Sequence, residues 1–247
     1  MKNQYIGDAG DYGKYGLLRF LLSSGIDTGV NWYLTPDDGR NDGNHTEYLY
    51  DERMRTYDHE VYDTMKRIAP LQDRNISMTE QSGILPGARF YNTVMDFSST
   101  SWLERAKARM KWHKDAMKAL QDVELIFADP DNGLSIRQRP TKKEAQKYIL
   151  PLEIMDYYRR DQQVMYYHHR SRKNEEGWLE DKRQIKAFLP DAKLLAVSFH
   201  RWSARTYIFV LHENRYARYK QILNDFMRTK WGTHTVNGKV PFTFERI

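Results

Sequence analysis

Short apolar stretches typical of β-strands alternate with amphipathic helical segments along most of this 247-residue chain. Apolar runs bounded by turn residues predict strands, and apolar side chains that recur every three or four residues predict helices. The expected strands cover residues 29–34, 88–91, 123–128, 163–167, 193–199, 206–211 and 240–244, and the expected helices cover 14–22, 46–69 with a break, 102–120, 142–150, 152–160, 175–188 and 215–230. This alternation predicts one doubly wound α/β catalytic domain over residues 1–247, with a mostly parallel sheet, helices on both faces and an antiparallel C-terminal edge.

The composition excludes several classes of protein. The chain has no cysteine, which rules out disulfide scaffolds, zinc–cysteine modules, iron–sulfur sites and thiol nucleophiles. It has no apolar run long enough to span a membrane, and residues 1–5 lack the apolar segment of a secretory signal, so we expect a cytoplasmic protein. The formal net charge of +6 favours a phosphate-bearing partner, and we expect DNA and no membrane.

Polar side chains follow four of the expected strands at the point where each strand ends. They are Asp37 and Asp38; Asp129, Asp131 and Asn132; His168, His169 and Arg170; and His200 and Arg201. Ligands of a doubly wound sheet bind outside the carboxyl ends of its strands. These residues therefore predict a functional cleft at one edge of the sheet.

The pair Asp129-Pro130 is the most specific of these signals. A carboxylate at the tip of a buried strand, followed by a proline with a fixed φ and no N–H, projects from rigid backbone. The alternative is a loop cap followed by a plain turn. An EF-hand is rejected because Gly133 comes one position early and no bidentate glutamate follows. A magnesium site at Asp129 and Asp131 ranks low, and we expect no metal and no cofactor.

Two adjacent histidines, His168 and His169, follow the fourth strand. Neighbouring side chains on a strand point to opposite faces, so one imidazole can be catalytic while the other packs. We assign the catalytic role to His168; the alternative is two solvated histidines. Basic segments at 107–118, 170–173 and 215–228, with aromatic residues between them, fit nucleic-acid binding as well as a solvated surface.

The N-terminal run 5–15 resembles the opening motif of the 23S ribosomal RNA adenine-N6 methyltransferases of the J type, His-Ala-Gly-Asn-x-x-Asp-x-x-Lys-His. Gly7, Asp11 and Lys14 match this motif, and Asp8 stands for its Asn. The resemblance implies an α/β scaffold in which Asp11 and Lys14 contact S-adenosylmethionine.

Two further segments extend this resemblance and also depart from it. Residues 33–40, which include Asp37, lie where that family has its turn for S-adenosylmethionine, but they carry Pro-Asp-Asp instead of small residues. Asp129-Pro130 matches the start of the Asp-Pro-Pro-Tyr motif, but Asp131 and Asn132 replace its second half. These departures indicate that the scaffold carries other chemistry.

Residues 14–18 and 129–134 also resemble a mostly uncharacterised bacterial family that includes a phage-defence DNA glycosylase removing glucosylated hydroxymethylcytosine. Asp129-Pro130 after an apolar strand is similar, in addition, to the water-activating Asp-Pro-Tyr-His motif of uracil-DNA glycosylases. These resemblances imply excision of a modified base from phage DNA, which leaves an abasic site and needs no cofactor.

Three hypotheses follow, of which a DNA glycosylase in antiviral defence ranks first. In it, Asp129 supplies the carboxylate, Asp131 or Asn132 positions water or the base, and His168 donates to the departing base. The base is extruded from the duplex. The residues assigned to substrate binding are Asp8, Asp11, Lys14, Asp37, Asp38, His169, Arg170, His200 and Arg201, with Arg170 holding a phosphate. The alternatives are an S-adenosylmethionine-dependent adenine methyltransferase acting on nucleic acid and a non-catalytic nucleic-acid-binding module.

Overall fold

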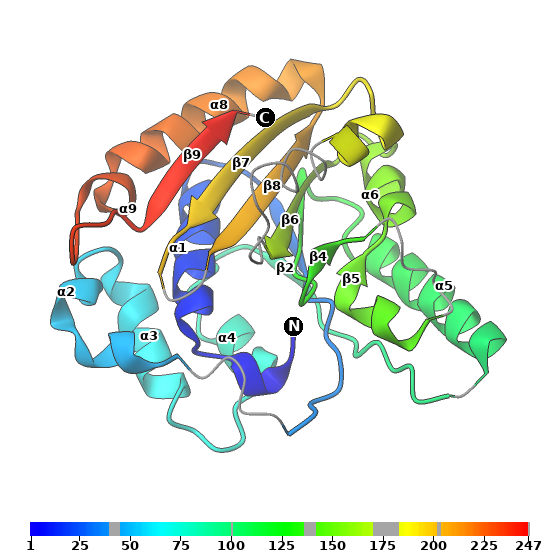
Figure 1. Ribbon diagram of the computed structural model, residues 1–247, viewed down its shortest axis with the longest axis horizontal. Helices are drawn as coiled ribbons and strands as arrows, with labels where there is room; N and C mark the ends of the chain where they lie inside the picture. Colours follow the sequence, from blue (N-terminus) through cyan, green and yellow to red (C-terminus); the bar gives the residue numbers. More distant parts are fainter. Residues whose placement is uncertain (40–44, 100, 136–141, 170–182, 202–203, 247) are drawn as a thin grey trace.

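The computed structural model describes residues 1–39, 45–99, 101–135, 142–169, 183–201 and 204–246. These residues form a seven-stranded sheet in the order β2-β1-β3-β6-β8-β7-β9 and a two-stranded sheet of β4 and β5. The strands are β1 Thr28–Asn31, β2 Arg89–Tyr91, β3 Leu125–Ala128, β4 Gly133–Leu134, β5 Tyr148–Ile149, β6 Gln163–His169, β7 Lys193–Phe199, β8 Arg205–Leu211 and β9 Phe242–Arg246. The α-helices are α1 Ala9–Ser23, α2 Glu52–Arg55, α3 His59–Ile68, α4 Ile76–Gln81, α5 Trp102–Ala119, α6 Pro151–Tyr158, α8 Glu213–Arg228 and α9 Lys230–Thr233 (Figure 1).

The seven-stranded sheet is parallel in one half and antiparallel in the other. Strands β2, β1, β3 and β6 are parallel. β8 runs antiparallel to both β6 and β7, and β9 runs antiparallel to β7. The predicted α/β fold with an antiparallel C-terminal edge is therefore confirmed. Because β8 is reversed, its first residue, Arg205, lies at the edge where β6 ends, opposite His169.

Each face of the sheet has its own apolar core. Along β3, Leu125 and Phe127 pack in the core that contains the apolar residues of α1 and α8. Ile126 and Ala128 point the other way, into the core that contains Trp112 of α5 and the apolar residues of α6. Figure 1 shows α1 and α8 on one side of the strands and α5 and α6 on the other. None of the helices in the described ranges is both long and apolar enough to cross a membrane.

Two expected helices differ from the observed ones for local reasons. α1 begins at Ala9 instead of residue 14, because the Asp8 carboxylate caps it by accepting a hydrogen bond from the Gly10 N–H at 2.6 Å. The expected helix over 142–150 is wrong: Lys143–Lys147 is a 3₁₀ turn and the next two residues are β5. Pro151 explains this, because the residue before a proline is driven to extended backbone and proline favours the first turn of a helix, here α6.

An ion pair buried on the α5 face fixes the chain that leaves β1. The Arg109 guanidinium on α5 binds the Glu153 carboxylate on α6 at 2.7 Å. Glu153 also accepts a hydrogen bond from the Tyr33 hydroxyl at 3.1 Å. Tyr33 has a φ of +46°, a left-handed conformation that a bulky side chain adopts only when its surroundings hold it there. The network therefore holds the backbone at the point where the sheet opens into its crevice.

Candidate functional site

The sheet has a topological switch point between β1 and β3, since the chain passes from β1 to β2 on one side and β3 pairs with β1 on the other. Ligands of doubly wound sheets bind in the crevice beyond such a point. Asp129 is the first residue after β3, and its N–H donates to the Asn31 carbonyl at the end of β1 at 3.0 Å. It follows Phe127 by two residues, so its side chain is directed to the α1 side of the sheet.

A buried lysine joins α1 to this carboxylate. The Lys14 Nζ atom lies 2.7 Å from Oδ2 of Asp129 and 2.7 Å from Oδ1 of Asp11. All three side chains are more than nine-tenths buried. Burial opposes the charge of Lys14, but the two carboxylates raise its pKa well above the usual value. Burial also raises the pKa of Asp11, with Lys14 opposing it. With every group charged, the cluster has two negative charges and one positive charge.

The first residues of the chain line the same crevice. The main-chain nitrogen of Met1 lies 2.7 Å from Oδ1 of Asp131 and donates to the carbonyl oxygens of Tyr33 and Asp129 at 3.2 and 3.1 Å. Lys2 forms an ion pair with Asp38. The N-terminal segment thus contacts Asp38 and Asp131, which come from two different loops.

The opposite wall comes from β6 and β8. The Tyr167 hydroxyl and Nδ1 of His169 are 3.0 Å apart. Burial lowers the pKa of His169 and the nearby Arg205 lowers it further, so the imidazole is neutral at pH 7. Burial raises the pKa of Tyr167 to about 12, which keeps its hydroxyl protonated. The Arg205 guanidinium forms an ion pair with Asp8 at the start of α1.

These groups surround an open cavity of about 580 Å³, which we term the Asp129 cavity. Its charged and polar lining residues are Lys2, Asp8, Asp11, Lys14, Asp38, Asp129, Asp131, Asn132, Lys147, His169 and Arg205, and its aromatic ones are Tyr5, Tyr167 and Tyr207. The volume falls within the range of roughly 300–1,000 Å³ that is usual for small-molecule sites.

The structure brings together most, but not all, of the residues expected at the site. Asp8, Asp11, Lys14, Asp38, Asp129, Asp131, Asn132 and His169 line the cavity. His168 does not: it points to the α5 face, where its Nδ1 accepts a weak hydrogen bond of 3.4 Å from the Leu134 N–H. A Cβ atom at Gly133 would lie 2.6 Å from this Nδ1, so His168 packs directly on the backbone of β4. The imidazole that faces the cavity is His169.

Three other expected residues lie outside the Asp129 cavity, and a fourth is not described. Asp37 is exposed and accepts a hydrogen bond from the Gln4 N–H at 3.2 Å. His200 contacts the Thr243 hydroxyl at 2.6 Å beside β9. Arg201 binds the carbonyl oxygens of Val236 and Lys239 and so holds the turn before β9. Arg170 lies outside the described residues.

Sequence reasoning missed Lys2, Arg205, Tyr167 and Tyr207 as cavity residues. Tyr167 and Tyr207 are opposite one another in the β6–β8 pairing, as are His169 and Arg205. Alternation along β6 puts Tyr167 on the same face as His169, so the tyrosine could have been predicted once the histidine was placed. Nothing local in the sequence indicated Lys2.

Comparison with known proteins supports the fold alone. No protein-family model and no curated protein matches the chain. Among solved structures, the chain is similar to protein LPL1258 from Legionella pneumophila, of the DUF519 family. The TM-score is 0.51 and the sequence identity 12%, and the match covers 98% of this chain and 97% of that one. The similarity in fold therefore extends over nearly the whole of both chains.

Proposed function

We propose that the protein is a DNA glycosylase that excises a modified nucleobase and leaves an abasic site. The observation that carries the proposal is the position of Asp129: its carboxylate is held by Lys14 at the switch-point crevice and lines an open cavity. Cleavage of an N-glycosidic bond builds positive charge on the sugar, and a fixed carboxylate beside C1′ stabilises that charge.

The reaction is a hydrolysis, which the cavity residues can serve without a further reactant. The C1′–N bond breaks and its electron pair leaves with the base, while a water oxygen forms the new bond to C1′. Asp129 stabilises the oxocarbenium-like sugar and, with Asp131, accepts the proton that the water loses. Lys14 acts as a positioning residue, because it lies buried behind the carboxylate between α1 and β3.

His169 takes the role that the sequence had assigned to His168. Its neutral imidazole has one donor and one acceptor nitrogen. If the protonated Tyr167 hydroxyl donates to Nδ1, the hydrogen is on Nε2, which can donate to the departing base. A neutral donor of this kind stabilises negative charge on a leaving group, and the release of the base then takes up one proton from solvent.

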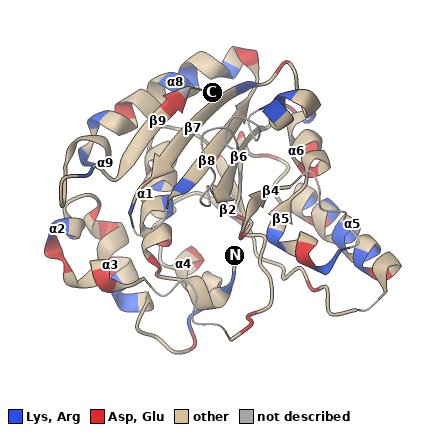
Figure 2. Ribbon diagram, viewed as in Figure 1, with Lys and Arg blue, Asp and Glu red and all other residues tan. Residues whose placement is uncertain are grey.

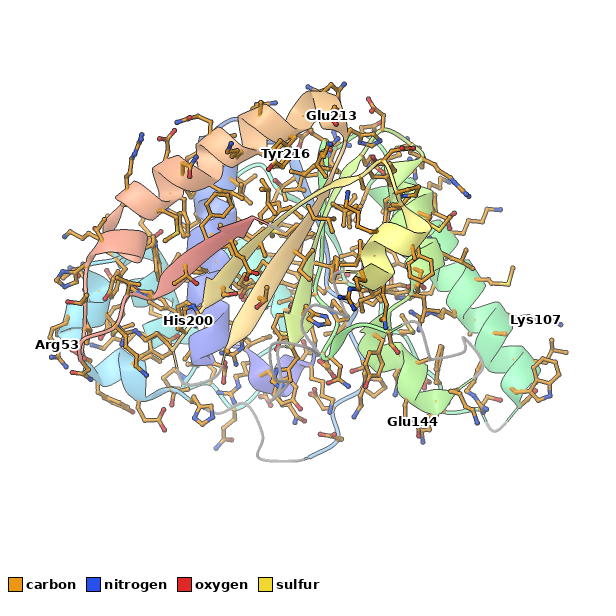
Figure 3. All side chains as sticks on the ribbon, turned by 45° about the horizontal axis from the view of Figure 1, so that its top comes forward. Arg53, Lys107, Glu144, His200, Glu213 and Tyr216 are labelled. Carbon is orange, nitrogen blue, oxygen red and sulfur yellow. The ribbon has the colours of Figure 1, made fainter. Side chains whose placement is uncertain are left out.

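Helix α5 supports nucleic acid as the partner. This helix has six basic and two acidic side chains, and so carries +4 of the chain's formal net charge of +6. Lys107, Lys111, Lys114 and Lys118 are exposed and follow one stripe, spaced four, three and four residues apart. Figure 2 shows basic residues along α5, and Figure 3 shows Lys107 on the outer side of the helix.

The stripe differs from the basic positions Lys66 on α3 and Lys193 on β7. Lys66 and Lys193, whose side chains are 48% and 41% exposed, are each paired with a glutamate, at 2.9 and 2.8 Å. On α5, Lys111 pairs with Asp115, but Lys107, Lys114 and Lys118 form no ion pair with any residue in the described ranges. Unneutralised lysines in a row suit a phosphate backbone.

The finer substrate assignment is part of the proposal. The resemblance of residues 14–18 and 129–134 to a phage-defence glycosylase implies glucosylated hydroxymethylcytosine, and hence a role in antiviral defence. A cavity of about 580 Å³ leaves room for an extruded base with a bulky substituent.

An adenine methyltransferase is the second candidate, favoured by one observation. Lys14, from the N-terminal motif, lies 2.7 Å both from Asp11 of the same motif and from Asp129 of the Asp-Pro motif, so the two motifs come together. However, Met1 is buried beyond β1, where its main-chain nitrogen donates to the Tyr33 carbonyl oxygen, and this leaves less space there for a cofactor. Titration calorimetry with millimolar S-adenosylmethionine tests this candidate: binding that is lost in Asp11→Asn supports it, and an absence of heat removes it.

The proposed function is tested by incubating the protein, without added cofactor, with phage DNA that carries glucosylated hydroxymethylcytosine and with unmodified DNA. An aldehyde-reactive probe then counts abasic sites. The proposal expects such sites in the modified DNA alone. Abasic sites in neither DNA, nor in DNA with other modified bases, would contradict it.

A further inference from the structure

Arg205 lines the Asp129 cavity, and only part of its guanidinium has a partner within the described residues. Its side chain is 16% exposed, and Nη2 forms an ion pair with Oδ1 of Asp8. Nη1 is buried and makes no hydrogen bond within the described part of the chain. Burial opposes its charge, but Asp8 and the hydroxyl groups of Tyr167 and Tyr207 raise the pKa of Arg205 above its usual value. The guanidinium is thus charged and incompletely satisfied.

Packing holds this guanidinium in one position. It lies against the first turn of α1 at Gly10, where a Cβ atom would overlap it. A side chain at this position would therefore push the guanidinium away, which gives Gly10 a specific reason to be glycine. Because Asp8 binds the guanidinium and Gly10 packs against it, a ligand would not meet the entropy cost of ordering a flexible arginine.

The unsatisfied N–H donor of Arg205 is not part of an anion site at the N-terminus of α1. The first N–H groups of α1 are already used: Ala9 donates to the His45 carbonyl, and Gly10 donates to the Asp8 carboxylate. A ligand at this wall of the cavity would therefore meet side-chain donors, namely Arg205 and, beside it, His169.

We infer that Nη1 of Arg205 binds a non-bridging oxygen of the phosphate next to the extruded nucleotide. The inference rests on the proposed function and orients its substrate. A buried guanidinium with an unsatisfied N–H donor favours an anionic oxygen acceptor, and hydrogen bonds from arginine to phosphate are among the stronger ones in proteins. The carboxylates Asp129 and Asp131 also line the cavity, and they would repel a phosphate placed beside them. The phosphate therefore faces β8, and the sugar C1′ faces Asp129.

A methylphosphonate scan tests this interaction. The probe is a short duplex with an uncleavable tetrahydrofuran abasic analogue, in which one phosphate at a time near the analogue is replaced by a neutral methylphosphonate. We expect one position at which the replacement weakens binding to the wild-type protein on the order of tenfold. Arg205→Gln should bind the all-phosphate duplex more weakly by the same factor and be indifferent to replacement at that position.

Gly10→Ala provides an independent variant, because it displaces the guanidinium without removing its charge. Its binding should also be indifferent to the methylphosphonate at that one position. Far-ultraviolet circular dichroism of both variants checks that they are folded. If every position weakens wild-type and Arg205→Gln binding equally, the inference is overturned while DNA binding stands. If the methylphosphonate at one position weakens binding to the wild-type protein but not to Arg205→Gln, and no base is released from any modified DNA, the proposed chemistry fails and the phosphate interaction stands. If no duplex binds, both are overturned.

Discussion

Nζ of Lys14 lies 2.7 Å from Oδ2 of Asp129, which joins the first helix to the end of the third strand across 115 positions of sequence. The same nitrogen holds Asp11 one helical turn away. A buried lysine between two carboxylates cannot rotate freely, so the direction of the Asp129 side chain is set by α1 as well as by β3. The site thus depends on the packing of the N-terminal helix against the sheet.

Asp129→Asn should abolish base release while keeping the shape of the cavity. The amide cannot accept a proton from water or balance positive charge on the sugar, and we expect a loss of about 10²-fold or more in the single-turnover rate. DNA binding should be unchanged or tighter, because one negative charge is removed. Asp37→Asn is the matched control: Asp37 is exposed outside the cavity, and its variant should release base at the wild-type rate.

Lys14→Met should destabilise the fold strongly. It leaves Asp11 and Asp129 buried without their cation, and breaking a buried ion pair from one side costs roughly 3–5 kcal/mol. Urea unfolding measures this change. Lys66→Met, at an exposed pair on α3, should change the free energy of unfolding by less than about 1 kcal/mol. If the two substitutions lowered the free energy of unfolding equally, the buried ion pairs of Lys14 would be contradicted.

Substitution of His169 should affect catalysis, whereas substitution of His168 should affect stability. His169→Phe should slow base release, since it removes the donor that faces the cavity, and His168→Phe should instead reduce stability, since it disturbs packing on Gly133. Single-turnover kinetics and thermal unfolding of both variants make the comparison. A catalytic loss confined to His168→Phe would restore the assignment made from the sequence.

The lowered pKa of His169 also predicts a dependence of stability on pH. Just below pH 6.5, the usual pKa of histidine, the unfolded chain takes up a proton on this imidazole, whereas the folded protein resists protonation. Its contribution to stability is therefore complete above pH 6.5 and is lost as the pH falls below that value. Urea unfolding from pH 5 to 8 should show this loss in the wild-type protein and a smaller one in His169→Gln. Identical dependence of stability on pH in the wild-type protein and in His169→Gln would contradict the contribution of His169.

Replacing Lys107, Lys111, Lys114 and Lys118 with glutamine should weaken DNA binding and reduce its salt dependence. Each lysine that no longer neutralises a phosphate lowers the slope of log K against log salt by about 0.9 for duplex DNA. Fluorescence anisotropy over a range of salt concentrations measures that slope. Lys66→Gln with Lys193→Gln is the control, since both lysines are exposed but paired with glutamates. An equal change in slope for the control would remove α5 from the interface.

The alternating pattern predicted the α/β fold because apolar strands and amphipathic helices differ in period, and the sequence shows both periods clearly. It failed at 142–150, where a helical composition is overridden by Pro151. The start of α1 was missed because glycines lower helix propensity, and in the structure Gly10 and Gly13 are needed where Arg205 and Phe199 approach the helix.

The site was only partly predictable for a geometric reason. Alternation shows that His168 and His169 face opposite ways, but which of them faces α1 depends on how the sheet packs. The carboxyl ends of the expected strands do not indicate Arg205, because the reversed β8 brings its first residue to that edge. Asp37 and Asp38 are adjacent, yet only Asp38 meets Lys2, an ion pair with no local signal in the sequence.

The central claim is tested most directly by mass spectrometry of free bases released in a single turnover from glucosylated hydroxymethylcytosine DNA, with wild-type protein and Asp129→Asn in parallel. Catalysis by Asp129 predicts that the modified base appears in solution with the wild-type protein, in amounts equal to the abasic sites formed, and that it does not appear with Asp129→Asn. Release of the base by Asp129→Asn at the wild-type rate would contradict that role.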